Sequence, residues 1–224
     1  MKLLTSSLAA VALAGVTIVT PVSAQVTGAV GTVNAPATIA STNALRTAFQ
    51  QIGTTYQAQQ TQLEQITQQR DGLLRQLDTN GDGGLDQAEQ QAAQTAPQIQ
   101  QISQLENQMA QISNQIDGAR IYAIEQIARQ YGAALQQVTQ ADALQIVLNR
   151  DAVAYAAPAA SIDAKVAAAL NTRVPSVQVV PPADWQPSQQ SVALYQQIAQ
   201  LLLIAQARQQ AQQQTPATQQ PTGR

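Results

Sequence analysis

The chain has 224 residues and a formal net charge of −2. This length allows one or two modest domains, and the charge gives no basic field that would attract nucleic acid or anionic lipid. The chain contains no cysteine and no histidine, so disulfides are excluded and the usual serine or cysteine nucleophiles would lack their base. No glycine-rich phosphate loop precedes a predicted helix. We therefore expect neither an enzyme nor a nucleotide site, and the abundant alanine, glutamine and leucine favour long helices.

Residues 1–24 have the pattern of a secretory signal peptide. A short positive start is followed by an uncharged apolar run, and Val22 and Ala24 occupy the small-residue positions of a cleavage site. The alternative, an uncleaved membrane anchor, is disfavoured by this cleavage site and by the polar chain that follows it. We expect an exported mature chain that begins near Gln25 and has no integral membrane segment.

The first half of the mature chain predicts a short β-prone segment and then a long helix. Valines alternate with small residues in 25–40, and Pro36 ends this run. Helix N-caps follow at 41–43, and apolar residues then recur at alternating steps of four and three, as in a coiled-coil seam. The seam predicts one helix from 41 to 77, roughly 50 Å long. Its members are Leu45, Phe49, Ile52, Tyr56, Leu63, Ile66, Leu73 and Leu77.

A second seam of the same kind begins after Pro97. Two seams of similar length joined by a compact break indicate an antiparallel helical hairpin. We therefore predict that residues 41–140 form a hairpin arm, which needs an association domain because it buries little on its own. The members of the second seam are Ile102, Leu105, Met109, Ile112, Ile116, Ala119, Ala123, Ile127, Tyr131, Leu135 and Val138.

Residues 141–180 resemble such an association domain. The run "LQIVLN", the turn at 149–151 and the run "AVAYA" predict a β-hairpin or a bent strand. "SIDAKVAAALN" predicts a helix with Ser161 as its N-cap, and "VPSVQVV" predicts a final strand. With residues 25–40, this region forms a β-rich body, so the predicted fold is mainly α with a small β body.

Residues 181–224 predict a proline-bounded linker, a helix at 188–213 and a disordered tail. The apolar run "LLLI" in this helix is far too short to span a membrane. We expect the helix to be amphipathic and to dock on the body.

The stretch "DTNGDGGLDQAE", residues 78–89, fills every position of an EF-hand calcium loop. Such a loop supplies six to eight oxygens to the ion, and a glycine at its sixth position permits the sharp turn. The alternative is a plain polar turn, since aspartate, asparagine and glycine are common in turns. No second loop is present to pair with this one, so we predict weak binding of Ca²⁺. The predicted ligands are Asp78, Asn80, Asp82, the carbonyl of Gly84, Asp86 through water, and Glu89 with both oxygens.

The sequence resembles the OmpH (Skp-like) family of periplasmic chaperones over roughly residues 29–174. The most specific part is "LQIVLNRDAVAYAAPAASIDAKVAAAL", and the strand "VGTVN" that leads into the first long helix also matches. The resemblance implies a periplasmic homotrimer joined through a β-rich trimerisation body. Three coiled-coil arms would enclose a cavity that holds unfolded outer-membrane proteins without using a nucleotide. Oligomerisation is then expected at Val33, Leu148, Val153 and Tyr155.

One departure from the family concerns charge. Its familiar members are basic, with arms rich in lysine and glutamate, whereas glutamine takes those positions here. Glutamine has nearly the same helix propensity but no long-range field. Client capture would therefore rely on apolar and polar contacts. Two alternatives remain open: a calcium-responsive coiled-coil adaptor, and a structural periplasmic protein without general clients.

Overall fold

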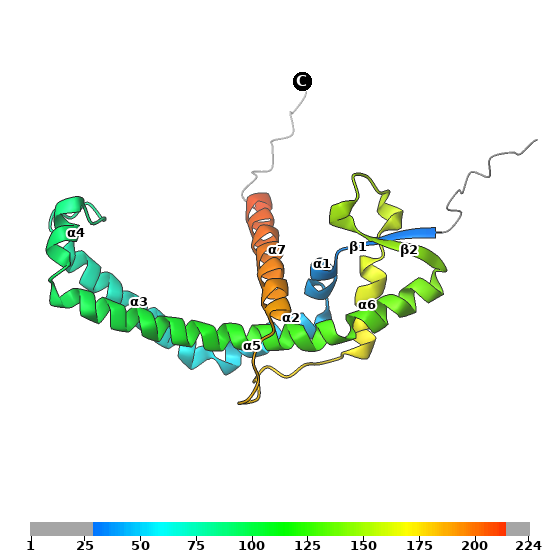
Figure 1. The fold of residues 1–224 in the computed structure, drawn as a ribbon, viewed down its shortest axis with the longest axis horizontal. Helices are drawn as coiled ribbons and strands as arrows, with labels where there is room; N and C mark the ends of the chain where they lie inside the picture. The colour runs from blue at the N-terminus through cyan, green and yellow to red at the C-terminus, as the bar shows by residue number, and fades with distance from the viewer. Residues whose placement is uncertain (1–28, 214–224) are drawn as a thin grey trace, which may run out of the picture.

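A computed structural model describes residues 29–213; the predicted signal peptide and C-terminal tail lie outside them. The described part is mainly helical, with one two-stranded parallel sheet. Figure 1 shows an elongated, curved molecule: the long helix α5 (Pro97–Ala141) runs along most of it, with the short helix α4 (Gln87–Ala93) at one end and the sheet at the other. No helix in residues 29–213 is long and apolar enough to cross a membrane.

The chain enters through strand β1 (Ala29–Val33) and helix α1 (Ala35–Ala40). The strand agrees with the β-prone pattern of 25–40, but a helix at 35–40 was not predicted. This helix forms because the side chain of Asn34 accepts a hydrogen bond from the amide of Ala37 at 2.9 Å and caps its first turn. Pro36 lies in the first turn of α1, where proline has no helical hydrogen bond to lose. The residue expected to end a strand therefore starts a helix.

The predicted helix 41–77 is divided into α2 (Asn43–Thr55) and α3 (Gln57–Leu77). The division lies at Tyr56, which follows a glycine and two threonines, all weak helix formers. The amide of Tyr56 still bonds the carbonyl of Ile52, and the amide of Gln60 bonds the carbonyl of Tyr56, so helical hydrogen bonds continue across the division. The prediction of one continuous helix was therefore wrong at this residue, although both halves pack along α5.

Helices α2 and α3 pack antiparallel along α5. Leu45 shares a cluster with Ile124 and Ile127 near the sheet, whereas Leu77 meets Ile102 at the far end. The middle of the arm is closed by a cluster that consists of predicted seam residues and of Ala48, which the seam did not include. The buried members of this middle cluster are Ala48, Ile52, Tyr56, Ile66, Ile112, Ile116, Ala119 and Ala123. The two heptad patterns thus identify the faces that meet.

Strand β2 (Leu144–Asn149) pairs in parallel with β1, although the whole arm separates them in sequence. The predicted hairpin after β2 is absent from the described structure. The side chain of Asn149 accepts from the amide of Asp151 and starts the 3-10 turn η1 (Arg150–Ala152), and a second turn, η2 (Pro158–Ala160), follows. The expectation of a strand in "AVAYA" was therefore wrong.

Helix α6 (Asp163–Arg173) matches the predicted helix, but Ser161 is not its cap. The Ser161 hydroxyl donates to the carboxylate of Asp163 at 2.9 Å instead of accepting from a helix amide. Ile162 occupies the cap position and contributes to the core below the sheet. Its amide donates to the carbonyl of Thr32 in β1, which ties α6 to the strand.

The segment from α6 to helix α7 (Gln189–Gln213) contains no strand, so the strand predicted in "VPSVQVV" was also wrong. Residues 176–178 of this segment bind to a helix instead of a sheet, because the side-chain amide of Gln126 in α5 bonds both backbone groups of Gln178. It accepts from the Gln178 amide at 3.0 Å and donates to its carbonyl at 2.9 Å. Figure 1 shows this segment passing beneath α5 on its way to α7.

We expect Gln126→Ala to release this segment locally. Two neutral hydrogen bonds are removed, each contributing about 1 kcal/mol. Amide exchange at Gln178 should therefore become faster, whereas the exchange of α5 amides should not change. Hydrogen exchange measured residue by residue would check this, with Gln130→Ala, an exposed glutamine one turn away, as the control. Equal exchange at Gln178 in the two variants would contradict the role of Gln126.

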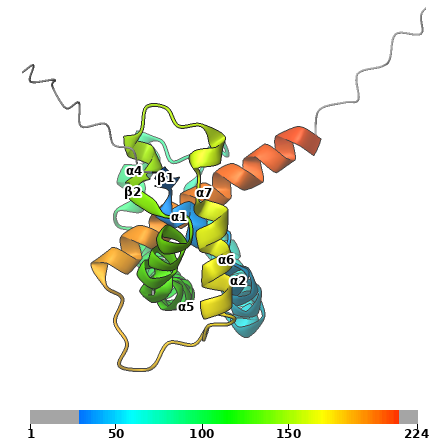
Figure 2. The same ribbon diagram turned by 90° about the vertical axis from the view of Figure 1, so that its right-hand side faces the viewer.

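Helix α7 leaves the body at a steep angle to α5 (Figures 1 and 2). Its first half docks: Ile198 is fully buried, and the Tyr195 hydroxyl donates to Asp117 of α5 at 2.6 Å. Burial raises the pKa of Tyr195, and the hydrogen bond to Asp117 raises it further. From Leu202 onward the helix is exposed, including Leu203 at 66 %. The expectation of an amphipathic, docked helix therefore holds only for the first half.

Candidate functional site

The loop at 78–89 joins α3 to α4 at the far end of the arm. Gly81 and Gly83 have φ angles of +72° and +88°, which other residues rarely adopt. The carboxylate of Asp78 accepts from both of their amides, at 2.7 and 2.9 Å. The Asp82 carboxylate likewise accepts from the amide of Gly84 at 2.9 Å. The glycines expected from the sequence thus form a tight turn around the first aspartate.

Glu89 holds the two ends of the loop together. One of its carboxylate oxygens accepts from the amide and hydroxyl of Thr79, at 2.6 and 2.8 Å, and from the amide of Asn80 at 3.0 Å. The other accepts from the amide of Asp86, which reciprocates as the N-cap of α4. The Thr79 hydroxyl and the Asp86 amide hold the pKa of Glu89 below its ordinary value. This carboxylate is therefore a structural clasp in the described loop.

The loop fits a calcium ion only in part. The glycines and Asp78 form the expected frame, but Glu89 faces backbone amides rather than the other carboxylates. Over residues 29–213, no group of three or more aspartate, glutamate, histidine or cysteine side chains is arranged to hold a metal ion. Coordination by Glu89 would require it to leave Thr79 and Asn80.

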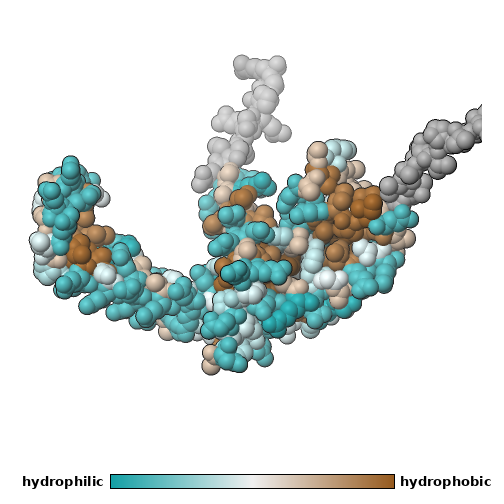
Figure 3. Space-filling view, in the orientation of Figure 1, coloured by the Kyte–Doolittle hydropathy of each residue, from teal (hydrophilic) through white to brown (hydrophobic). Residues whose placement is uncertain are grey.

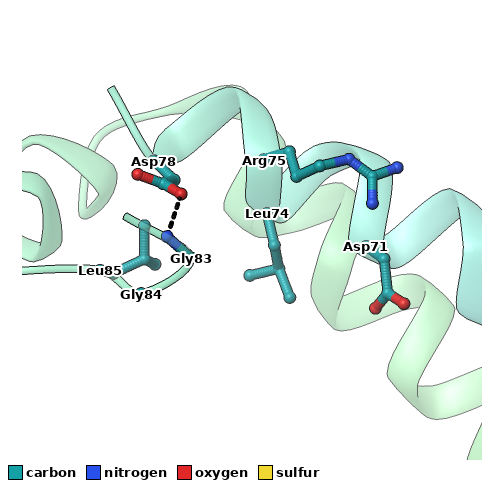
Figure 4. A pocket seen from close by; sticks show the side chains of 7 residues that line it. All are labelled: Asp71, Leu74, Arg75, Asp78, Gly83, Gly84 and Leu85. Carbon is teal, nitrogen blue, oxygen red and sulfur yellow. Dashed lines mark hydrogen bonds between the residues drawn. The ribbon is translucent and has the colours of Figure 1, made fainter. Parts of the chain in front are cut away.

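A pocket of about 350 Å³ lies between the loop and the end of α3 (Figure 4). Leu74 borders it from α3, and Gly83, Gly84 and Leu85 border it from the loop. Leu85 also packs against the cluster formed by Leu77, Ala93 and Ile102. The loop is thus anchored to the arm by an apolar contact as well as by the Glu89 clasp.

The residues expected to mediate oligomerisation lie at the sheet end of the molecule, but not all of them are accessible. Leu148 is 42 % exposed and Tyr155 is 83 % exposed, whereas Val33 is 7 % exposed and packs in the chain's own core. Val153 is half-buried beside Tyr155 in a second pocket. We therefore assign Val33 to the interior of the body instead of an interface.

The sheet itself is incomplete within the described part of the chain. β1 is flanked by β2 on one side and by the bridge from Thr32 to Ser161 on the other, whereas β2 has no second neighbour in residues 29–213. Val30, Ile146 and Leu148 are exposed on these strands, and Figure 3 shows an apolar patch at this end of the molecule. Two parallel strands with exposed apolar residues are not expected to be stable without a further covering element.

The surface of the arm is rich in amides and poor in charge. α3 carries four charged residues, two of which, Arg70 and Asp71, pair with each other at 2.7 Å. Between Pro97 and Ile116, the only charged residue of α5 is Glu106. Most of the exposed positions of both helices are glutamines. Away from the four carboxylates of the loop, α3 and the outer part of α5 therefore present mainly hydrogen-bonding groups and little net charge.

A polar centre in the body was not predicted from the sequence. One oxygen of Asp163 accepts from the amide of Asn34 at 2.7 Å and from the hydroxyl of Thr38 at 2.9 Å. The other accepts from Ser161 and from the guanidinium of Arg150. Asp163 thus joins the β1–α1 junction, the turn after β2 and the start of α6. Since its partners are as many as 129 residues away, no local pattern could identify it.

Comparisons with known proteins give one structural likeness to report. No protein-family model and no curated protein matches the chain. A crystal structure from Caulobacter crescentus CB15, described as an OmpH-like outer membrane chaperone, is similar over 71 % of this chain and 94 % of that one, with 22 % sequence identity and a TM-score of 0.39.

Proposed function

We propose that this chain is an ATP-independent periplasmic holdase that binds unfolded outer-membrane proteins between helical arms. The supporting observation is the arrangement of a long, glutamine-rich helical arm on a small body whose sheet has an open edge. An arm of this kind offers many weak contacts along its length. Such contacts suit a ligand without fixed structure, and the resemblance of residues 29–174 to the OmpH family supports the same role.

The proposal includes assembly into a homotrimer. The open edge of β2 and the exposed Ile146 and Leu148 beside it need a partner surface, because an unpaired strand edge pairs readily with another chain. A second copy would supply an identical β1–β2 unit. Three arms would then surround a common space, which is what a holdase requires in order to shield one unfolded chain from another.

Capture from a cell-envelope extract tests the function. A tagged mature chain should bring down many unrelated β-barrel precursors if it is a holdase. One stoichiometric partner would instead support an adaptor, and the exposed Leu202, Leu203 and Ile204 on α7 are the surface such a partner would use. Recovery of no partner at all would favour a structural role and contradict the proposal.

The proposal also gives the arm tip a weak calcium site, for which the glycine frame around Asp78 is the support. The side chains of Asp78, Asn80 and Asp82 would hold the ion with the carbonyl of Gly84, and Asp86 would act through water. Glu89 would leave the amides of Thr79 and Asn80 to join them. Bound calcium would supply positive charge among these carboxylates and stiffen the tip. A dissociation constant of about 10⁻⁴ to 10⁻³ M is typical of extracellular sites.

We expect millimolar calcium to raise amide protection in residues 73–93 and to leave residues 141–170 unchanged. The stabilisation should stay below about 1.5 kcal/mol if calcium is at most tenfold above its dissociation constant. Glu89→Gln should abolish this response, whereas Glu64→Gln, which changes an exposed arm carboxylate outside the loop, should not. Identical calcium titrations of wild type and Glu89→Gln by calorimetry and hydrogen exchange would show that the loop is a plain polar turn and not a calcium site.

A further inference from the structure

Residues 176–180 show how a non-helical polypeptide segment, which bends at Val179 and Val180, binds to α5. Their side chains alternate: Val177 and Val179 are half-buried against the apolar cluster of the arm, whereas Gln178 and Val180 are exposed. The side-chain amide of Gln126 accepts from the backbone amide of Gln178 at 3.0 Å and donates to its carbonyl at 2.9 Å. The Gln126 side chain thus makes the two backbone hydrogen bonds that a neighbouring strand would make with Gln178. Val177 and Val179, on either side of Gln178, pack against the apolar cluster of the arm.

Farther out along the arm, the same face of α5 presents another glutamine at the same angular position as Gln126. Gln108 precedes Gln126 by 18 residues, and 18 residues of α-helix make five full turns, or about 27 Å. A groove of about 440 Å³ opens there between α3 and α5. From α5 it is lined by Gln101, Gln104, Leu105 and Gln108, which stand 18 residues before Ala119, Tyr122, Ala123 and Gln126. From α3 it is lined by Gln69, Gly72, Leu73 and Gln76.

We propose that this groove binds an extended polypeptide segment with alternating apolar side chains, in the manner in which α5 binds residues 176–180. Gln104 and Gln108 bond the backbone amides and carbonyls of the segment, and Leu73 and Leu105 receive its apolar side chains. The inference rests on the proposed function, because an unfolded client supplies the segment. It adds the position of the site and the conformation of the ligand.

The lining of the groove favours this ligand over a charged one. Every polar side chain in it is a glutamine, which can donate and accept a hydrogen bond as a peptide group does. None of the lining residues carries a charge that could pair with a charged ligand, and leaving a charge unpaired at a partly apolar site is costly. Alternation of apolar and polar residues is the pattern of membrane β-strands, so segments of unfolded β-barrel proteins fit the groove.

The test uses the full mature chain and a synthetic peptide, Ser-Val-Gln-Val-Gln-Val-Ser. A photoreactive benzoylphenylalanine in place of Gln101, which lines the groove, should crosslink to this peptide, whereas the same group at Gln100, which is exposed and outside the groove, should not. A peptide of identical composition with its three valines consecutive should crosslink weakly at both positions. Equal crosslinking from Gln101 and Gln100 would overturn the proposal.

Substitution of the groove glutamines gives the second measurement. Gln104→Ala with Gln108→Ala should weaken binding of the alternating peptide about tenfold, the loss expected from one or two hydrogen bonds. The matched pair Gln68→Ala with Gln100→Ala, which removes two exposed glutamines outside the groove, should weaken it less than about twofold. Equal losses of peptide affinity in the two double variants would overturn the proposed groove site, even if the wild-type chain still suppresses client aggregation. Peptide binding in the groove without suppression of aggregation overturns the proposed holdase and leaves the site standing.

Discussion

Replacing Asp163 with alanine should lower the free energy of unfolding by about 2 to 3 kcal/mol, because the part-buried amide of Asn34 loses a charged acceptor and three further hydrogen bonds are removed. The side chain is only 20 % exposed and accepts from Asn34, Thr38, Ser161 and Arg150. Alanine would leave the Asn34 amide without its acceptor, whereas the Thr38 hydroxyl would keep the carbonyl of Asn34. The body should therefore lose the contact that joins β1, α1 and α6.

Urea denaturation followed by circular dichroism would measure this loss. Asp163→Asn keeps an oxygen for Asn34 and Thr38 but loses the charge opposite Arg150, so its effect should be smaller. Asp184→Ala removes an exposed aspartate in the segment before α7 and should change the midpoint little. If Asp163→Ala and Asp184→Ala unfold at the same urea concentration, Asp163 does not hold the body together.

Leu148→Asp should dissociate the assembled protein into single chains. Leu148 is 42 % exposed on β2, beside the open strand edge where we place the trimer interface. A charge left unpaired in an apolar interface costs several kcal/mol, so subunit affinity should fall by about a hundredfold or more. The helical content should persist, because Leu148 contributes little to the core of its own chain.

Light scattering at micromolar concentration would give the mass of each form. We expect three chains for the wild-type mature protein and one chain for Leu148→Asp. Leu203→Asp places the same charge on the exposed half of α7 and should leave the mass at three chains. A wild-type protein that scatters as a compact monomer would exclude the trimer.

The sequence predicts the arm well and the body only in part, for a physical reason. Ile66 and Ile112 belong to seams whose spacing is local, so their helices and buried faces can be read from short windows. The pairing of Val30 with Ile146 joins strands separated by the whole arm, and no short window contains it. After β2, the side chain of Asn149 bonds the next turn, and this competes with the hairpin that the flanking valines favour.

The candidate sites, like the fold, could be predicted from the sequence only in part. The glycines at 81 and 83 have the positive φ angles that the loop pattern requires, because only glycine adopts them without strain. The direction of Glu89 could not be predicted, since several amides of the loop compete for its carboxylate. The hydrogen bonds between the Gln126 side chain and the backbone of Gln178 could not be predicted either, because in the sequence Gln126 is one of many similar glutamines along the helices.

Suppression of aggregation at different salt concentrations tests the central claim most directly. A urea-unfolded outer-membrane β-barrel protein is diluted into buffer with and without the mature chain, and turbidity is followed at low and moderate ionic strength. The account predicts that the chain keeps this client soluble and that the effect is nearly independent of salt, because α3 and the outer part of α5 carry little net charge for salt to screen. Aggregation that proceeds as fast with the chain as without it would contradict the holdase, and protection that collapses as salt rises would contradict capture by glutamine-rich arms.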